Sequence, residues 1–173
     1  FALFTTALSQ SDITSIYNDG VPNDISSLSP YTYYKMGEGA IFPQIPNEMA
    51  YSKQSLLFDG LSDYVDASGV ASSLQSDNTF TISLWAKADY ENLNPAFSLS
   101  TGSDASKTFV IYPYDTNVAT DDCRIWYNGT NIIQTGNTSL TGWNHFCFVS
   151  NGATSHTVYI NGVSAGTSST SKT

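Results

Sequence analysis

Positively charged residues are scarce in this sequence. Six lysines and arginines stand against fifteen aspartates and glutamates, which leaves a net charge of −9 at neutral pH. Nucleic acids and anionic membrane surfaces are bound through clusters of basic side chains, so the sequence argues against both kinds of partner. Most of the carboxylates are spread along the chain, and their ordinary effect is to keep a protein soluble.

Long hydrophobic runs and cysteines are also lacking. No apolar run approaches the ~20 residues that a membrane-spanning helix needs, so membrane insertion is not expected. The two cysteines, Cys123 and Cys147, form no Cys-x-x-Cys pair, which argues against a zinc site. A single disulfide and two buried thiols both remain open.

Residues suited to catalysis are few as well. The three glutamates, Glu38, Glu48 and Glu91, do not form the strand motif of close carboxylates that glycoside hydrolases on β-sandwich folds use. His145 and His156 occur without a Gly-x-Ser-x-Gly elbow, and His145 alternates with apolar residues as a core histidine does. Because no glycine-rich phosphate loop occurs either, we expect a protein that is not an enzyme.

Apolar and hydroxyl-bearing residues dominate instead. Apolar residues make up 40% of the chain and aromatic residues 13%, which is enough to bury a core. Charged residues make up only 12%, about half the globular norm. A surface that is polar through hydroxyls and amides suits an extracellular, cell-surface or virion protein.

Alternation of apolar and polar residues predicts strands along most of the chain. In "TFTISLWAKA" (79–88), Phe80, Ile82 and Leu84 share the face that we expect in the core. Further expected strands are "KTFVIYPY" (107–114), "CRIWYNG" (123–129), "WNHFCFVS" (143–150) and "HTVYINGV" (156–163). Asn-Gly pairs at 128–129, 151–152 and 161–162 favour type I′ hairpin turns. Together these features predict an all-β, antiparallel two-sheet β-sandwich of the jelly-roll kind.

One short helix is expected near residues 10–18. Ser9 is a suitable N-cap, Asp12 follows three residues later as a capping box, and Gly20 is the expected stop. Its apolar face consists of Ile13, Ile16 and Tyr17. The segment 35–50 lacks periodicity and is interpreted as a loop, and the Ser/Thr-rich tail 164–173 as a turn or linker.

Three stretches taken together resemble a known family. "SLLFDGLSDYVDAS" (55–68), "FTISLWAKA" (80–88) and "WNHFCFVSNGATSHTVYINGV" (143–163) resemble the laminin G-like, concanavalin A-like family, over about residues 31–166. The resemblance implies a non-enzymatic attachment module that binds a cell-surface glycan or protein, or spaces a binding tip. Tandem modules of this kind occur in phage appendages and bacterial surface proteins. The alternative is a purely structural, fibre-forming or capsid-decorating subunit that assembles with copies of itself by strand addition.

The resemblance also predicts how the chain is divided. Residues 1–24 resemble the final strand and helix of a preceding or partner module, and residues 25–173 resemble a module that lacks its own last strand. The chain would then be a segment of a tandem array. Phe1, Leu3 and Phe4 are too apolar to remain in water and need a sheet to join. We expect this strand to pair outside its own module, with closure onto its own module as the alternative.

Two aspartates are candidates for a metal site. Asp59 and Asp63 lie in the stretch "FDGLSDY", and the resemblance implies Ca²⁺, which takes six to eight oxygen ligands. The alternative is that Asp59 and Gly60 form a turn between strands, with the carboxylate bonded to nearby amides.

Four aromatic residues are candidates for binding a glycan. Sugar sites on this fold use exposed aromatic rings that stack on pyranose faces. The candidates are Trp126, Tyr127, Tyr112 and Tyr114. The alternative for each is an ordinary place in the core or on the surface of a strand.

Overall fold

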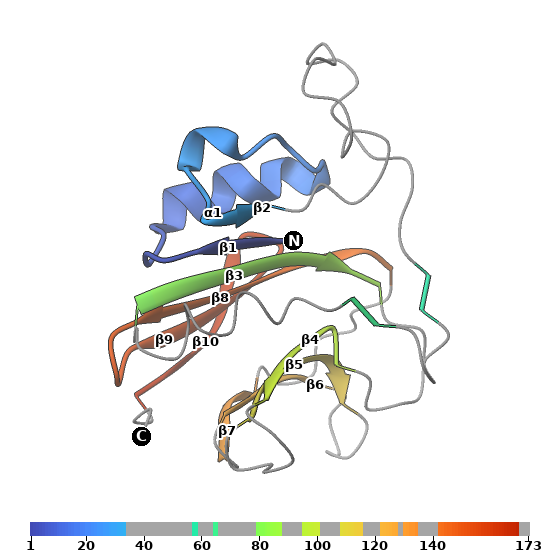
Figure 1. The fold of residues 1–173 in the computed structure, drawn as a ribbon. Coiled ribbons are helices and arrows are strands. Elements are labelled where there is room, and N and C mark those ends of the chain that lie inside the picture. Colours follow the sequence, from blue (N-terminus) through green and yellow to red (C-terminus); the bar gives the residue numbers. More distant parts are fainter. Residues whose placement is uncertain are drawn as a thin grey trace.

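The structure is a computed structural model that describes residues 1–33, 57–58, 64–65, 79–87, 95–100, 108–115, 122–127, 130–134 and 142–169. The helical elements are α1 (Gln10–Tyr17), η1 (Asn18–Gly20) and η2 (Ser26–Leu28). The strands are β1 (Ala2–Phe4), β2 (Thr32–Tyr33), β3 (Thr79–Ala86), β4 (Phe97–Ser100), β5 (Thr108–Asp115), β6 (Asp122–Tyr127), β7 (Thr130–Gln134), β8 (Asn144–Asn151), β9 (His156–Ile160) and β10 (Val163–Ser168). Within these ranges the strands form two antiparallel sheets (Figure 1), with orders β10-β9-β8-β3-β1-β2 and β4-β5-β6-β7. The predicted β-sandwich with one short helix is confirmed.

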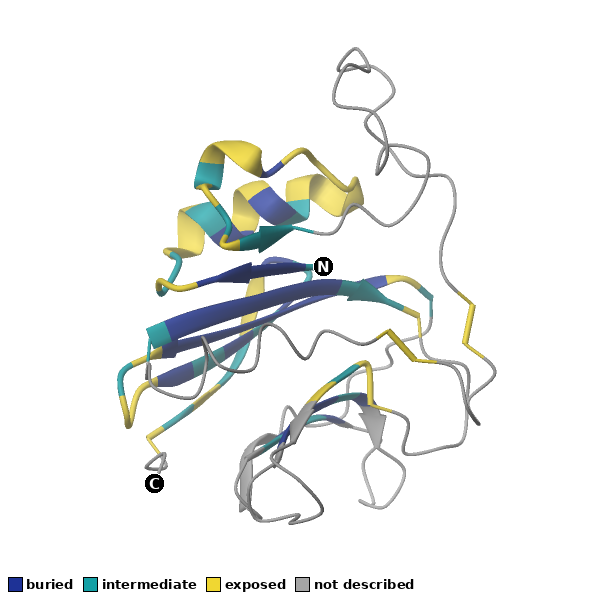
Figure 2. Cartoon of the chain, viewed as in Figure 1, coloured by how far each residue is buried: buried dark blue, intermediate teal, exposed yellow. Residues whose placement is uncertain are grey.

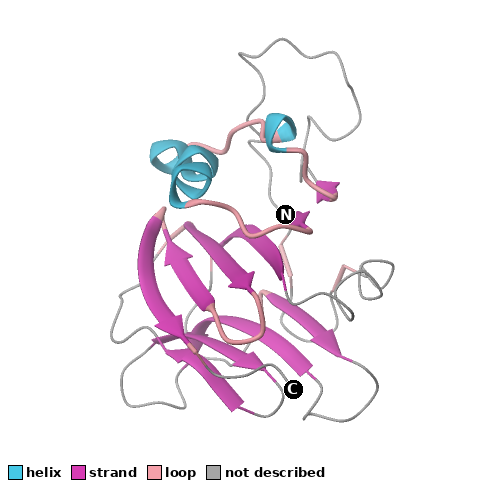
Figure 3. Ribbon diagram, turned by 90° about the vertical axis from the view of Figure 1, so that its left-hand side faces the viewer, coloured by secondary structure: helices cyan, strands magenta, loops and turns pink. Residues whose placement is uncertain are grey.

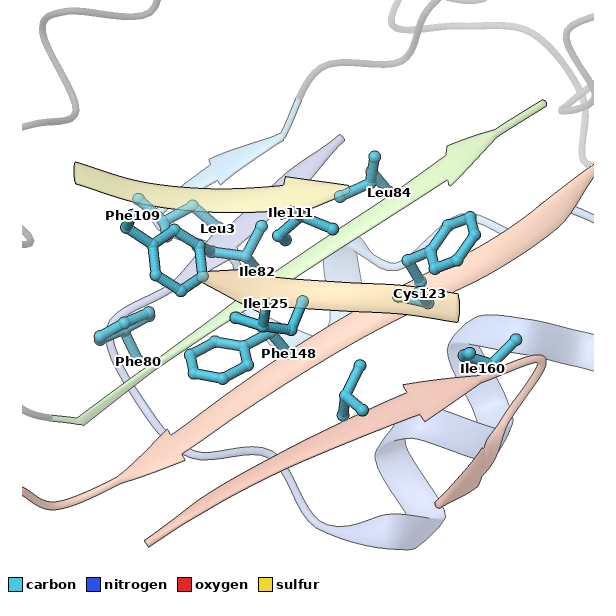
Figure 4. Packing of buried hydrophobic residues seen from close by; sticks show 12 residues of the cluster. Leu3, Phe80, Ile82, Leu84, Phe109, Ile111, Cys123, Ile125, Phe148 and Ile160 are labelled. Atoms are coloured by element: carbon cyan, nitrogen blue, oxygen red, sulfur yellow. The ribbon is translucent and has the colours of Figure 1, made fainter. Parts of the chain in front are cut away.

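The main core lies between the two sheets (Figure 4). The larger sheet contributes the predicted face of β3, and Phe80, Ile82 and Leu84 are all buried there. Phe109 of β5 meets this face, and its ring centroid lies 6.1 Å from that of Phe80 and 5.0 Å from that of Phe148. Each large apolar side chain removed from water contributes about 1.5–3 kcal/mol, so this layer is the main source of stability.

The other face of the six-stranded sheet is covered by α1 (Figures 1 and 3). Ile13 of the helix packs against Cys147 and Val149 of β8. Thr81 and Ser83 of β3 are buried on this side as well, although polar side chains that alternate with a core face are more often exposed. The central strands are therefore buried on both faces, as Figure 2 shows for β3 and β8.

Helix α1 begins as the sequence predicts and ends earlier. The Ser9 side chain accepts a hydrogen bond from the backbone N–H of Asp12, and the Asp12 carboxylate accepts one from the backbone N–H of Ser9. The helix ends at Asn18, which has a left-handed backbone with φ of 46°, rather than at Gly20. Asparagine is one of the few residues that adopts this conformation readily, so the stop needs no glycine.

Strand β1 occupies a place inside its own module. Leu3 pairs with Ile82 of β3 on one side and with Thr32 of β2 on the other, and its side chain is 0% exposed. The expectation that this strand pairs outside its module is therefore wrong. A strand tethered to its acceptor in the same chain meets it at a higher effective concentration than a strand of another chain, which favours closure within one chain. The division at residue 24 into parts of two modules stays a prediction.

The C-terminal hairpin confirms one expected turn and corrects the expected linker. Asn161 and Gly162 have φ of 51° and 77°, as a type I′ turn requires. This turn carries the chain into β10, so 164–173 is not simply a turn or linker. Serine and threonine residues can form an edge strand when a tight hairpin turn places their backbone beside β9. At 151–152 the connection is longer, since the Asn151 N–H donates to the Ser155 carbonyl at 2.8 Å. The expected loop 35–50 and turn 128–129 lie outside the described residues.

The two cysteines are separate buried thiols. Cys123 lies in the core between the sheets, and Cys147 lies under α1 on the opposite face of the larger sheet. Burial raises the pKa of the Cys147 thiol, which keeps it protonated and unreactive.

Candidate functional site

The outer face of the four-stranded sheet brings two of the candidate aromatic residues together. In the β5–β6 ladder, Tyr112 pairs with Arg124, and Val110 pairs with Trp126. Paired residues of an antiparallel ladder point to the same side of the sheet. Because Ile111 and Ile125 point into the core, Tyr112, Arg124 and Trp126 share the side turned away from it.

The Arg124 guanidinium contacts both aromatic rings. Its guanidinium carbon is 5.6 Å from the centre of the Tyr112 ring and 5.2 Å from the centre of the Trp126 ring. These distances are within the range of a cation–π contact. All three side chains are half-buried, so each keeps part of its surface toward solvent. We call this set of three residues the aromatic–arginine cluster.

Arg124 is not among the candidate residues that the sequence patterns indicate. Two signals could have identified it. It is the only arginine in the chain, and it stands two residues before Trp126 in a strand, which places both side chains on one face. Next to the cluster, β7 pairs Gln134 with Arg124 and Asn131 with Trp126 along the backbone, so two amide residues occupy the neighbouring register positions.

The side chains of the remaining candidate residues lie outside the described part of the structure. The backbones of Tyr114 and Tyr127 belong to β5 and β6, while their side chains lie outside the described part of the structure. Tyr127 is the backbone partner of Phe109, a core residue. Asp59 and Asp63 lie outside the described residues, and calcium binding there stays a prediction. The residues that are described contain no group of three or more His, Cys, Asp or Glu side chains that could hold a metal.

A second polar cluster lies under α1. Ser83 Oγ and His145 Nε2 are 2.8 Å apart, in hydrogen-bond contact, and both residues are buried. The imidazole stacks against Tyr17 of the helix, with ring centroids 6.3 Å apart, and also contacts the Trp85 ring, at 5.4 Å and an interplanar angle of 41°. The interpretation of His145 as a core histidine is therefore confirmed.

The environment of His145 keeps its imidazole neutral. Burial, together with the smaller effect of the positive charge of the chain's first amino group, lowers its pKa from 6.5 to about 4. Its Nδ1 has no hydrogen-bond partner among the residues that the structure describes, so no carboxylate there completes a Ser-His-Asp arrangement. The second histidine, His156, is buried as well, with Nδ1 3.2 Å from Ser150 Oγ.

The residues around His145 account for two of the sequence motifs in structural terms. Asn161 of the hairpin turn accepts a hydrogen bond from the His145 backbone N–H at 2.9 Å, and its amide donates to Asn144 Oδ1 at 2.8 Å. Gln10 of α1 donates to the carbonyl of Gly162 at 2.7 Å. The "WNH" and "NG" stretches thus join β8, the β9–β10 turn and the helix, which leaves the outer face of the other sheet as the candidate binding surface.

Comparison with known proteins identifies the family. A laminin G-like family model, described as the concanavalin A-like lectin/glucanases superfamily, matches residues 58–173, which is more than half of the chain. Searches of curated proteins and of solved structures found no match. Where the structure describes the chain, no helix has the length and apolar character to cross a membrane. The matched segment contains β3 to β10, which are the whole four-stranded sheet and four strands of the six-stranded one, so the chain belongs to the concanavalin A-like lectin/glucanase superfamily.

Proposed function

We propose that the chain is a non-enzymatic attachment module that binds glycans through the outer face of its four-stranded sheet. The observation that carries the proposal is the aromatic–arginine cluster, in which the rings of Tyr112 and Trp126 both contact Arg124 on a face turned away from the core. Membership of a superfamily that includes lectins supports the same conclusion.

The chemistry of the cluster suits a sugar. The C–H face of a pyranose ring packs on an aromatic face, and the hydroxyl groups around its rim take hydrogen bonds from polar side chains. Tyr112 and Trp126 project from neighbouring strands whose backbones are held by the ladder, so the rings are positioned before a ligand arrives. Preorganisation of this kind lowers the entropy cost of binding.

A shallow site of this size binds one sugar chain weakly. Attachment would then depend on several modules acting together, since linked sites raise the overall affinity by about 10²–10⁴. This fits a role at a cell surface, in the extracellular space or on a virion, where many copies face the same target. The low content of charged residues, 12%, supports such a location.

Two observations argue against catalysis and against assembly by strand addition. The Ser83–His145 pair is closed off beneath α1, which supports a function without catalysis. For assembly by strand addition, the acceptor position between β3 and β2 is filled by the chain's own β1. A binding module therefore agrees better with the structure than a subunit that needs a partner's strand.

A glycan array tests the proposal. The wild-type chain should bind a subset of glycans, and Trp126→Ala should lose that binding while keeping the same melting temperature within a few degrees. Trp143→Ala is the matched control, because Trp143 is a half-exposed tryptophan next to β8 of the other sheet. Arrays run with calcium and with EDTA would separate binding that depends on the metal from binding that does not. Glycan binding that survives Trp126→Ala, or an array without any bound glycan, would contradict the proposal.

A further inference from the structure

Two Asn-Gly pairs lie in described turns of the six-stranded sheet. Asn151 is the last residue of β8 and precedes Gly152, and Asn161 and Gly162 form the turn between β9 and β10. Asparagine is a chemically labile residue, and it is most labile before glycine, which has no Cβ to hinder attack by its backbone nitrogen. We propose that Asn151 is a site of spontaneous deamidation in the folded protein, whereas the structure protects Asn161. This inference does not rest on the proposed glycan binding.

The reaction needs water and no other partner. The backbone nitrogen of Gly152 attacks the side-chain carbonyl carbon of Asn151, and the side-chain nitrogen leaves as ammonia with the proton that the Gly152 nitrogen gives up. The product is a cyclic succinimide. Water then opens the ring at either of its carbonyl groups, which yields aspartate or isoaspartate. The first step requires an asparagine side chain that can rotate and a glycine nitrogen with room around it.

Both requirements are met at Asn151. The residue is exposed, and its side chain makes no hydrogen bond to the residues that the structure describes. The bond from its own backbone N–H to the Ser155 carbonyl, at 2.8 Å, leaves the side chain able to rotate. Around Gly152, no atom of the described structure beyond its chain neighbours lies within 4 Å of where a Cβ would stand. The succinimide ring can therefore form without moving a neighbouring residue.

Neither requirement is met at Asn161. Its Oδ1 accepts a hydrogen bond from the His145 backbone N–H at 2.9 Å, and its Nδ2 donates to Asn144 Oδ1 at 2.8 Å. Both hydrogen bonds must break before the side-chain carbonyl carbon can turn toward the nitrogen of Gly162. Gly162 is buried, and a Cβ placed on it would lie only 3.0 Å from the Tyr17 ring. The packing of α1 on this turn therefore leaves little room for the ring to form.

Deamidation at Asn151 should leave the sandwich folded. Asn151 and Thr79 form the last pair of the β3–β8 ladder, and the extra backbone carbon of isoaspartate falls between residues 151 and 152, beyond that pair. The product carries an added negative charge on a chain whose net charge is already −9. A stored preparation should therefore accumulate a folded species that an anion exchanger retains more strongly.

Ageing of the intact protein tests the proposal. The wild type would be incubated in warm, mildly alkaline buffer, both folded and unfolded in urea, and sampled over several days. Digestion under mildly acidic conditions followed by mass spectrometry would give the converted fraction at each asparagine separately, and the retention of the peptides would distinguish isoaspartate from aspartate. Asn151→Gln removes the proposed site, and Asn144→Ala removes one of the two hydrogen bonds that hold the Asn161 side chain.

In the folded wild type, Asn151 should convert at least about tenfold faster than Asn161, because only the second residue must first lose two hydrogen bonds. In urea the two rates should approach each other, since neither side chain is then held. Asn151→Gln should lose the acidic species that arises from this peptide. Asn144→Ala should speed the conversion of Asn161 and leave that of Asn151 unchanged. If that variant does not fold, the comparison of folded and unfolded wild type decides alone.

Two outcomes would overturn the proposal. If Asn161 converts as fast as Asn151 in the folded protein, the hydrogen bonds and the contact with Tyr17 do not protect it. If Asn151 stays intact in the folded protein while the unfolded chain converts fully, the turn at Gly152 does not allow the ring to form. Neither outcome affects the proposed glycan binding, because both asparagines belong to the six-stranded sheet and its turns.

Discussion

Acid should destabilise this chain through His145, and the size of the effect follows from where that residue lies. The imidazole is 0% exposed, under Tyr17 of α1, and its pKa is lowered from 6.5 to about 4 because burial disfavours the charged form. The charge of the chain's first amino group adds to the shift. In the unfolded chain the same side chain titrates at its ordinary value.

The sign and the magnitude can be worked out from these two values. Between pH 6.5 and about 4 the unfolded state binds more protons than the folded state, so the free energy of unfolding falls as the pH falls. A difference of one pKa unit corresponds to about 1.4 kcal/mol. The full difference therefore removes about 3 kcal/mol by pH 4, and about 2 kcal/mol of it is already lost by pH 5.

Urea unfolding followed by tryptophan fluorescence at about pH 7.5 and pH 5 measures this loss. His145→Gln should be less stable than the wild type near neutral pH but should lose about 2 kcal/mol less on acidification. Burial also lowers the pKa of the Phe1 amino group from 8.0 to about 6, so that group destabilises the fold between those values. Because both proteins carry this amine, the difference between them removes its contribution.

The other histidine provides the control. His156→Gln should keep the His145 contribution, so the difference between the single variant and the His145→Gln/His156→Gln double variant should again be about 2 kcal/mol over the same pH range. If His145→Gln loses stability as steeply as the wild type between pH 6.5 and 5, the imidazole is not held neutral by burial and the reasoning is refuted.

Three further predictions concern the N-terminal strand, the hairpin turn and the metal. Leu3→Ala should lower the free energy of unfolding by about 2–5 kcal/mol, because Leu3 is fully buried in the core; Val163→Ala, at an exposed position, should change it by less than about 0.5 kcal/mol, and equal effects would place β1 outside the core. Gly162→Ala should cost more than Gly152→Ala in the same urea assay, since both have positive φ but only the first would bring a Cβ within 3.0 Å of an aromatic ring of α1; a smaller cost at Gly162 would contradict that packing. If calcium binds, EDTA should lower the melting temperature of the wild type but not of Asp59→Ala. A wild-type melting temperature that EDTA does not change would favour the interpretation of Asp59 and Gly60 as a turn.

Patterns between near neighbours were sufficient to predict most of the secondary structure. Alternation placed Phe80, Ile82 and Leu84 on the core face of β3, and the pair Ser9 and Asp12 marked the start of α1. These features depend on the backbone periods of strands and helices and on hydrogen bonds a few residues apart. Because these causes act between residues close together in the chain, the features can be predicted from the sequence.

Contacts between distant parts of the chain decided the rest. The place of β1 depends on the pairing of Leu3 with Ile82, and no local pattern distinguishes that partner from the edge of another module. Ser83 and His145 are buried because α1 lies over their face of the sheet. A face that carries polar residues therefore becomes part of the interior.

The candidate site shows the same division. Trp126 and Tyr112 could be proposed as candidates from their residue type and from the strands that contain them. The residues that surround them could not be predicted in this way. The cross-strand register of β5 and β6 is what sets Arg124 opposite Tyr112. Register depends on which residues a whole sheet must bury, and it therefore becomes known only when the sandwich is complete.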